Sequence, residues 1–248
     1  MQRGHALLVH GAAGLGQWEL SLLLAQTWLC EANKSAAHPN PPCGRCESCH
    51  LLNAQSHADL FLLIPDAWRH ALGWDSASSE SEKSKPSRDI RVGDVRAAID
   101  WAHQTSSRGQ GKVLIIYPAQ RLNAISANAL LKTVEEPPGA LRIVLGADDP
   151  QALLPTLRSR CQKLAMHTPP PELALGWLSE QGVNDPDMML RAAGSRPLEA
   201  LELVRSGLDE RLWPELPALI KRGRAEAFSG MSVPMVVQSL QKLCADLM

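Results

Sequence analysis

The chain has 248 residues, of which 45% are hydrophobic and 21% are charged, and this balance is typical of a folded globular protein. Its length exceeds one typical core of about 100–150 residues, so more than one domain is expected. The formal net charge of −1 argues against a surface that binds nucleic acid over its whole extent, although a local basic patch remains possible. The sequence has no apolar run of the roughly 18–20 residues that a membrane span requires and no signal peptide, so a cytoplasmic, reducing location is expected.

The first two thirds of the chain alternate short apolar runs with segments of helical periodicity. Strands are predicted at 5–10, 60–64, 113–116, 141–145 and 162–166, and helices at 18–30, 94–106 and 123–136. This alternation predicts an α/β fold, with a parallel sheet that carries helices on both faces. The segment 76–87, which consists almost entirely of Ser, Lys and Glu, is predicted to be a mobile surface loop.

A run of prolines at 169–171 ends this alternation. Beyond it only helices are predicted, near residues 172–181, 185–193, 197–205 and 210–222. A domain boundary is therefore expected at about residue 167.

A glycine-rich loop follows the first predicted strand. Gly11, Gly14 and Gly16 lie where the pattern G-x-x-x-x-G-K-[ST] forms a loop that binds nucleotide phosphates. Gln17 stands in place of the lysine of this pattern and Trp18 in place of the hydroxyl residue, so the charge and the magnesium ligand are both missing. Taken alone, the glycines fit a degenerate phosphate loop and an ordinary strand-to-helix turn equally well.

A second feature of nucleotide hydrolysis is also missing. The predicted strand 113–116, where a carboxylate would hold the metal, is followed by Tyr117 and Pro118. The replacements at the two places are two independent losses, so the sequence predicts that this chain is not an active ATPase.

A cluster of cysteines follows the first predicted helix. Cys43, Cys46 and Cys49 form a C-x₂-C-x₂-C run, and Cys30 is inferred to be the fourth ligand of a closed tetrahedral site. Four thiolates in a reducing compartment indicate structural Zn²⁺, with an iron–sulfur cluster as the alternative. His50 and His57 are competing ligands. Cys161 and Cys244 are isolated and are interpreted as ordinary buried cysteines.

Two further stretches carry a resemblance to a known family. The segments SANALLKTVEEPP (126–138) and LPTLRSRC (154–161), with the cysteines inserted after the glycine loop and its helix, closely resemble bacterial DNA polymerase III clamp-loader subunits, which are AAA+ proteins related to the replication factor C subunits. The resemblance runs from about residue 4 to residue 205.

This resemblance implies a division into three parts. Residues 1–167 would form an AAA+ RecA-like domain with a zinc module at about 30–50, and residues 168–206 a helical lid domain. Residues 207–248 would supply only the beginning of the C-terminal helical collar domain, so the sequence is expected to be shorter than a whole family member.

Within the family, two subunit types carry the cysteine module. The gamma/tau type has a complete phosphate loop and an acidic strand end, and the delta-prime type has lost both. This chain matches the delta-prime type at Gln17, Trp18, Tyr117 and Pro118. Two further positions agree with that assignment. Active family members have a polar sensor residue after the strand that corresponds to 141–145, and this chain has Ala147 there. Their lid motif G-S-x-R ends in an arginine, and this chain has Pro197 in its place.

The resemblance also implies a role for the motif Ser159-Arg160-Cys161. In this family the motif presents an arginine finger to the ATP of a neighbouring subunit, so Arg160, with Ser159, is expected to act in trans, and Arg158 is the second candidate. The chain itself would be a non-catalytic subunit of the DNA polymerase III holoenzyme that does not bind ATP or binds it weakly. The implied partners are the gamma/tau ATPase subunits and the delta subunit, and indirectly the sliding clamp and primer–template DNA.

Two other functions compete with this interpretation. The first is an active clamp-loader motor ATPase of the gamma/tau type, which would require Gln17 and Tyr117 to be tolerated where charge is needed. The second is a zinc-dependent nucleic-acid-binding module. The cysteine segment argues against it, because Arg45 is its only basic residue and no aromatic residue is present to stack on bases.

Overall fold

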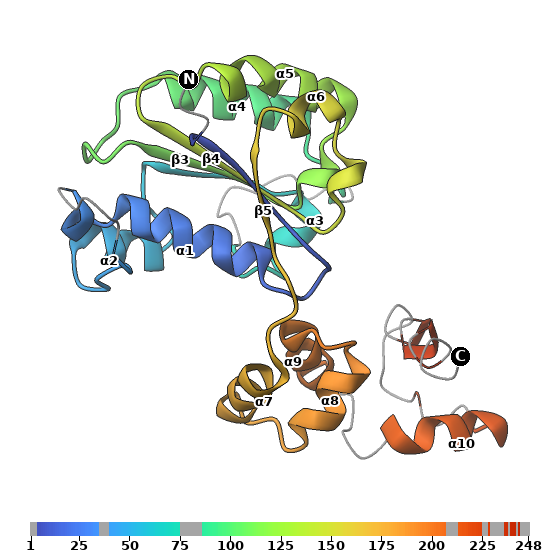
Figure 1. The fold of residues 1–248 in the computed structure, drawn as a ribbon. Coiled ribbons are helices and arrows are strands. Elements are labelled where there is room, and N and C mark those ends of the chain that lie inside the picture. The colour runs from blue at the N-terminus through green and yellow to red at the C-terminus, as the bar shows by residue number, and fades with distance from the viewer. Residues whose placement is uncertain are drawn as a thin grey trace. The chain divides into compact units, whose positions relative to one another are not determined.

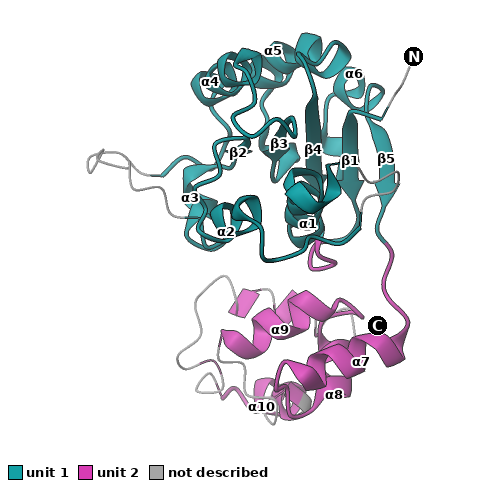
Figure 2. Ribbon diagram, turned by 90° about the vertical axis from the view of Figure 1, so that its left-hand side faces the viewer, with its two compact units in different colours: residues 1–12, 17–166 teal, residues 13–16, 167–248 magenta. Residues whose placement is uncertain are grey.

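The structure is a computed structural model that describes residues 4–34, 40–74, 86–206 and 213–224, together with single residues beyond them (228, 236, 237, 239–241 and 243). It divides into two compact units, residues 1–12 with 17–166 and residues 13–16 with 167–248 (Figure 2). The predicted loop 76–87 lies almost wholly outside the described residues, as do Cys244 and most of the segment 207–248.

Unit 1 is built on a five-stranded parallel sheet. Its strands are β1 (Ala6–His10), β2 (Leu60–Leu63), β3 (Lys112–Ile116), β4 (Leu141–Ala147) and β5 (Gln162–Ala165), in the order β2-β3-β4-β1-β5. Strand β3 is buried at every residue because helices cover both faces of the sheet, and this explains its continuous apolar run. Strand β5 lies at the edge and is exposed throughout. The predicted parallel α/β sheet is confirmed.

Helices cover the two faces of the sheet as separate layers. Helix α1 (Gln17–Leu29) lies on one face, and α4 (Val92–His103) and α5 (Ala124–Glu135) lie on the other (Figure 1). The stripe predicted on α4 is buried at Val95, Ala98 and Ala102, and it contributes to the core beneath α4 and α5. The opposite core contains Trp18 and the buried side of α1.

Three short helices were not predicted from the sequence: α2 (Glu47–Asn53), α3 (Asp66–Arg69) and α6 (Pro155–Arg158). Single 3₁₀ turns span Glu31–Asn33, Ala119–Arg121 and Pro150–Ala152. Helix α2 begins directly after Cys46, whose thiol accepts a hydrogen bond from the backbone N–H of Cys49. The cysteine run is therefore a loop that leads into a helix.

Unit 2 contains α7 (Pro171–Glu180), α8 (Pro186–Ala192), α9 (Pro197–Arg205), the 3₁₀ turn Trp213–Glu215 and α10 (Leu216–Lys221). A proline occupies the start of each of the first three helices, where its missing N–H leaves no helical hydrogen bond unmade. These helices share a core of their own. Its members with no exposed surface are Leu178, Met189, Ala193, Ala200 and Leu216.

The helix predicted at 210–222 begins among residues that are not described, and the structure has α10 in its second half. No helix in the described part of the chain is both long enough and apolar enough to cross a membrane.

Candidate nucleotide loop, cysteine cluster and arginine motif

The side chain of Gln17 is turned into its own glycine loop. Its Nε2 donates hydrogen bonds to the backbone oxygens of Gly11 at 2.6 Å and Ala12 at 2.8 Å, and the residue is almost completely buried. The amide therefore closes the loop on its N-terminal side. At the position where a phosphate-binding loop carries a lysine, this loop presents a neutral donor that carbonyls already occupy.

Aromatic rings fill the positions of the missing hydroxyl and carboxylate. Trp18 at the start of α1 and Tyr117 after β3 lie with their ring centroids 5.4 Å apart and their planes tilted by 37°. Trp74 packs edge-on against Trp18 at 6.3 Å, and Trp68 packs edge-on against Tyr117 at 6.5 Å. Trp18, Tyr117, Trp68 and Trp74 thus form an apolar cluster beside the glycine loop, in which Trp68 and Trp74 were not anticipated from the sequence.

Gly146 near the end of β4 makes room for this cluster. A Cβ atom on Gly146 would lie 2.7 Å from Cδ2 of Tyr117, which is closer than carbon atoms can approach. The next residue, Ala147, is fully buried and its carbonyl accepts a hydrogen bond from the N–H of Gly11 at 3.3 Å. Strand β4 therefore supports both the aromatic cluster and the glycine loop.

The four predicted cysteines come together. The Sγ atoms of Cys30, Cys43, Cys46 and Cys49 all lie within 4.8 Å of one another. Cys30 is 3.9 Å from Cys46 and Cys43 is 4.0 Å from Cys49, sulfur to sulfur. Tetrahedral coordination with zinc–sulfur bonds of about 2.3 Å requires sulfurs about 3.8 Å apart, so the cluster has the geometry to hold one metal ion.

Backbone donors favour the thiolate form at part of this cluster. The backbone N–H groups of Arg45 and Cys46 lower the pKa of Cys43 to about 6, whereas burial raises the pKa of Cys49 to about 12. The N–H of Cys43 also points at the sulfur of Cys30, at 3.4 Å. Such N–H donors stabilise the negative charge that metal-bound sulfur carries.

The two histidines near the cysteines do not join the cluster. His50 is exposed, and His57 is buried with its Nδ1 accepting a hydrogen bond from the N–H of Asp59 at 3.1 Å. Burial also lowers the pKa of His57, which keeps the ring neutral. Among the described residues, the ligand set consists of the four cysteines.

Arg108 ties the cysteine module to the rest of unit 1. Its guanidinium donates to Glu31 and Glu47, both at 2.7 Å, and these residues directly follow Cys30 and Cys46. The bond from Arg108 lowers the pKa of the Glu31 carboxyl. The loop that carries Arg108 is held in turn by Asp59, which accepts from the N–H groups of Ser107 and Arg108 at 2.7 and 3.0 Å. The sequence analysis missed this support.

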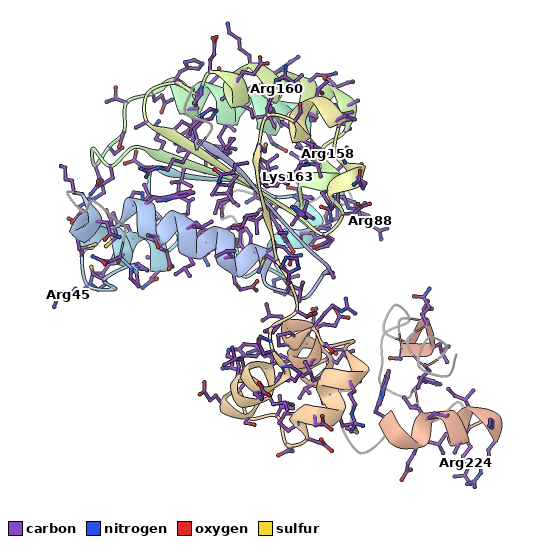
Figure 3. All side chains as sticks on the ribbon, in the orientation of Figure 1. Arg45, Arg88, Arg158, Arg160, Lys163 and Arg224 are labelled. Atoms are coloured by element: carbon purple, nitrogen blue, oxygen red, sulfur yellow. The ribbon has the colours of Figure 1, made fainter. Side chains whose placement is uncertain are left out.

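Arg160 lies just beyond α6 and remains accessible, with 35% of its side chain exposed (Figure 3). Its Nε pairs with the carboxylate of Glu135, and its Nη1 donates to the carbonyl of Thr156 at 2.7 Å. No described residue accepts a hydrogen bond from Nη2. Two of the three guanidinium nitrogens are therefore held, and Nη2 remains available to an anion.

The residues that flank Arg160 in the sequence make contacts of other kinds. Ser159 donates its hydroxyl to the carbonyl of Thr156 at 3.1 Å, and Cys161 is buried in the core, where burial raises its pKa to about 11. Arg158 donates to the carbonyl of Pro150 at 3.2 Å and to the side chain of Gln151. Arg158 thus bonds to its own loop through Nη1 alone, whereas Arg160 is held at both Nε and Nη1 and is the one of the two that pairs with a carboxylate.

These features define a class of protein: an α/β domain with a glycine loop after its first strand, with Gln17 and Trp18 directly behind that loop, and with a cysteine module inserted after its first helix. Residues 2–170 match the family described as DNA polymerase III, delta subunit, and the chain belongs to that family. The resemblance stated from the sequence is confirmed.

Relatives of this chain are named as subunits of DNA polymerase III. The chain is 35% identical over 214 residues to DNA polymerase III subunit delta' of Pseudomonas aeruginosa, covering 85% of this chain and 58% of that protein. It is 33% identical over 157 residues to DNA polymerase III subunit tau of Escherichia coli, covering 63% of this chain and 20% of that protein. A gamma subunit-related protein of Thermotoga maritima superimposes with a TM-score of 0.48 and 22% identity, over 89% of this chain and 62% of that one. The chain spans about half the length of the delta' relatives that it matches.

Proposed function

We propose that this chain is a delta-prime-type subunit of the bacterial DNA polymerase III clamp loader that does not hydrolyse ATP itself. Family membership supports the subunit assignment. The observation that carries the lack of hydrolysis is the closed glycine loop, in which Gln17 bonds to the loop's own carbonyls and Trp18 packs on Tyr117.

The reason is electrostatic. Transfer of a phosphoryl group requires a cation at the β- and γ-phosphates and a magnesium ion held by oxygen ligands. Gln17 brings no charge, and Trp18 and Tyr117 replace the metal-binding groups with aromatic surface. The backbone N–H groups at the start of α1 remain, and by themselves they bind an anion weakly.

The chain acts instead on ATP held by a neighbouring subunit. Arg160 is the arginine finger: its side chain is partly exposed, its guanidinium carries a positive charge, and Nε and Nη1 are anchored while Nη2 is available. Supplied in trans, it stabilises the charge that spreads over the oxygens of the transferring phosphoryl group. Ser159 helps to shape the turn that presents it.

The cysteine cluster holds a structural Zn²⁺ ion. Cys30, Cys43, Cys46 and Cys49 supply four thiolates and leave no open position for a substrate, which is the arrangement of structural rather than catalytic zinc sites. When bound, the ion cross-links the end of α1 to the start of α2.

The partners proposed for this chain are the gamma/tau ATPase subunits and the delta subunit, and through the assembled complex the sliding clamp and primer–template DNA. The proposed location is the cytoplasm. Residues 168–206 are assigned to the lid domain and residues 207–248 to the beginning of the collar domain that would hold the subunits together.

Two measurements test this proposal. Calorimetric titration of the purified protein with ATP and Mg²⁺ is expected to show no binding below millimolar concentrations. In a clamp loader assembled with the gamma/tau and delta subunits, Arg160→Ala is expected to slow ATP hydrolysis while the ring still assembles. Micromolar binding of ATP to this chain alone, or an undiminished rate with Arg160→Ala, would contradict the respective part of the proposal.

A further inference from the structure

Glu135 occupies a position where a carboxylate is unfavourable. It is the last residue of α5, and the C-terminal end of a helix carries partial negative charge from its unpaired carbonyl groups. Glu136 follows it directly, so two acidic side chains stand at the same helix end. A positive partner offsets this unfavourable interaction.

Arg160 is that partner for Glu135. The two residues are 25 positions apart in the sequence, and Nε of Arg160 donates to Oε1 of Glu135. Glu136 is exposed and forms no ion pair with a described residue. The contact is therefore specific to one of two adjacent and chemically identical side chains.

Both ends of this ion pair are attached to the rigid core. Val134, which precedes Glu135, is fully buried, and Cys161, which follows Arg160, is only 9% exposed. Both belong to the same apolar cluster, together with Leu157 of α6. Because the backbone on each side is fixed, the pair itself restrains the direction of the guanidinium.

We propose that Glu135 is the positioning residue for the arginine finger, an inference that rests on the proposed function of Arg160. Glu135 holds Nε and the carbonyl of Thr156 holds Nη1, which leaves Nη2, from which no described residue accepts a hydrogen bond, for the phosphate oxygens of a nucleotide on the neighbouring subunit. Restraining a long side chain before the reaction removes freedom that would otherwise be lost at the transition state.

The test compares variants of this protein in the assembled clamp loader, with ATP hydrolysis measured in the presence of the clamp and primer–template DNA. Glu135→Ala is expected to lower kcat by roughly 10- to 100-fold while KM for ATP changes little, because misdirected groups affect the transition state more than binding. Glu135→Gln is expected to recover most of the rate, since its carbonyl oxygen still accepts from Nε. Glu136→Gln is the matched control and is expected to leave kcat unchanged.

Arg160→Ala and the double variant Glu135→Ala/Arg160→Ala separate this inference from the function on which it rests. If Glu135 acts through Arg160, the double variant is no slower than Arg160→Ala alone. If Arg160→Ala slows hydrolysis but Glu135→Ala does not, the positioning role is wrong and the arginine finger stands. If Glu135→Ala speeds hydrolysis, Glu135 restrains the finger rather than positions it. If Arg160→Ala has no effect, both proposals fail. Melting temperatures and assembly of the ring show that each variant is folded.

Discussion

The indole of Trp18 and the phenol ring of Tyr117 are in contact, 5.4 Å apart between centroids, at the two positions where a nucleotide-hydrolysing site would hold its magnesium ion. From the sequence, Trp18 and Tyr117 were interpreted as two independent losses, one of the hydroxyl residue and one of the carboxylate. In the structure they form one contact, because restoring either polar residue would place it against the aromatic ring of the other. The two replacements therefore stabilise each other, and Trp18 at the start of α1 has become part of the core.

Replacing Trp18 tests whether this contact contributes to stability. Trp18→Ala is expected to lower the free energy of unfolding by about 3–5 kcal/mol, because it removes a large buried ring and leaves a cavity. Urea-induced unfolding followed by circular dichroism measures the change. Leu23→Ala in the same helix is the control: Leu23 is 47% exposed, so its loss is expected to cost less than about 1 kcal/mol. Equal costs for the two variants would show that Trp18 does not occupy a core position.

A lysine at position 17 tests whether the missing positive charge is the only obstacle to ATP binding. Gln17→Lys supplies a cation at the loop, but Trp18 and Tyr117 still exclude the metal ion, so ATP with Mg²⁺ is expected to bind no more tightly than at millimolar concentrations. Calorimetric titration of the variant beside the unchanged protein measures this. Micromolar affinity in Gln17→Lys would mean that the aromatic pair is no obstacle to the nucleotide.

Much of the fold could be predicted because it depends on local patterns. Strand β3 is a continuous apolar run because it is buried on both faces, and α4 shows a clear stripe because one of its faces meets the sheet. Helix α2 was missed for the opposite reason. Its seven residues include Cys49 and follow Cys46, so its conformation serves the sulfur cluster and has little apolar periodicity to reveal it.

The supports of the candidate sites could not be predicted, because they join residues that are distant in the sequence. Arg108 reaches Glu31 across 77 positions, and Arg160 reaches Glu135 across 25. Arg108 and Glu31 lie in no motif, and although Glu135 and Arg160 lie in the stretches 126–138 and 154–161, nothing in either stretch indicates that the two residues contact each other. The cysteines could be grouped from sequence because three of them lie within one short run.

Gly146 provides a test of how tightly the aromatic cluster is packed. Gly146→Ala would place a methyl group 2.7 Å from Tyr117, so it is expected to destabilise the protein by about 1–3 kcal/mol through overpacking. In a Tyr117→Leu background, where the ring is absent, the same change is expected to cost much less. Urea unfolding of the two single variants and the double variant gives the coupling between the sites. Additive costs would show that the glycine is needed for some reason other than the ring.

Replacing one cysteine tests both whether the cluster binds a metal ion and whether that ion stabilises the fold. Protein prepared with zinc in the medium is expected to contain one zinc ion per chain by elemental analysis, and Cys46→Ser is expected to lose the ion and melt at a lower temperature. Three remaining thiolates bind zinc less tightly, and the segments after α1 and around α2 then lose one of their links, while the bonds from Arg108 and Ser48 to Glu31 remain. Cys161→Ala is the control, because Cys161 lies in the apolar core and its loss is expected to leave the zinc content unchanged. Iron and a visible charge-transfer band in place of zinc would instead identify the cluster as an iron–sulfur site.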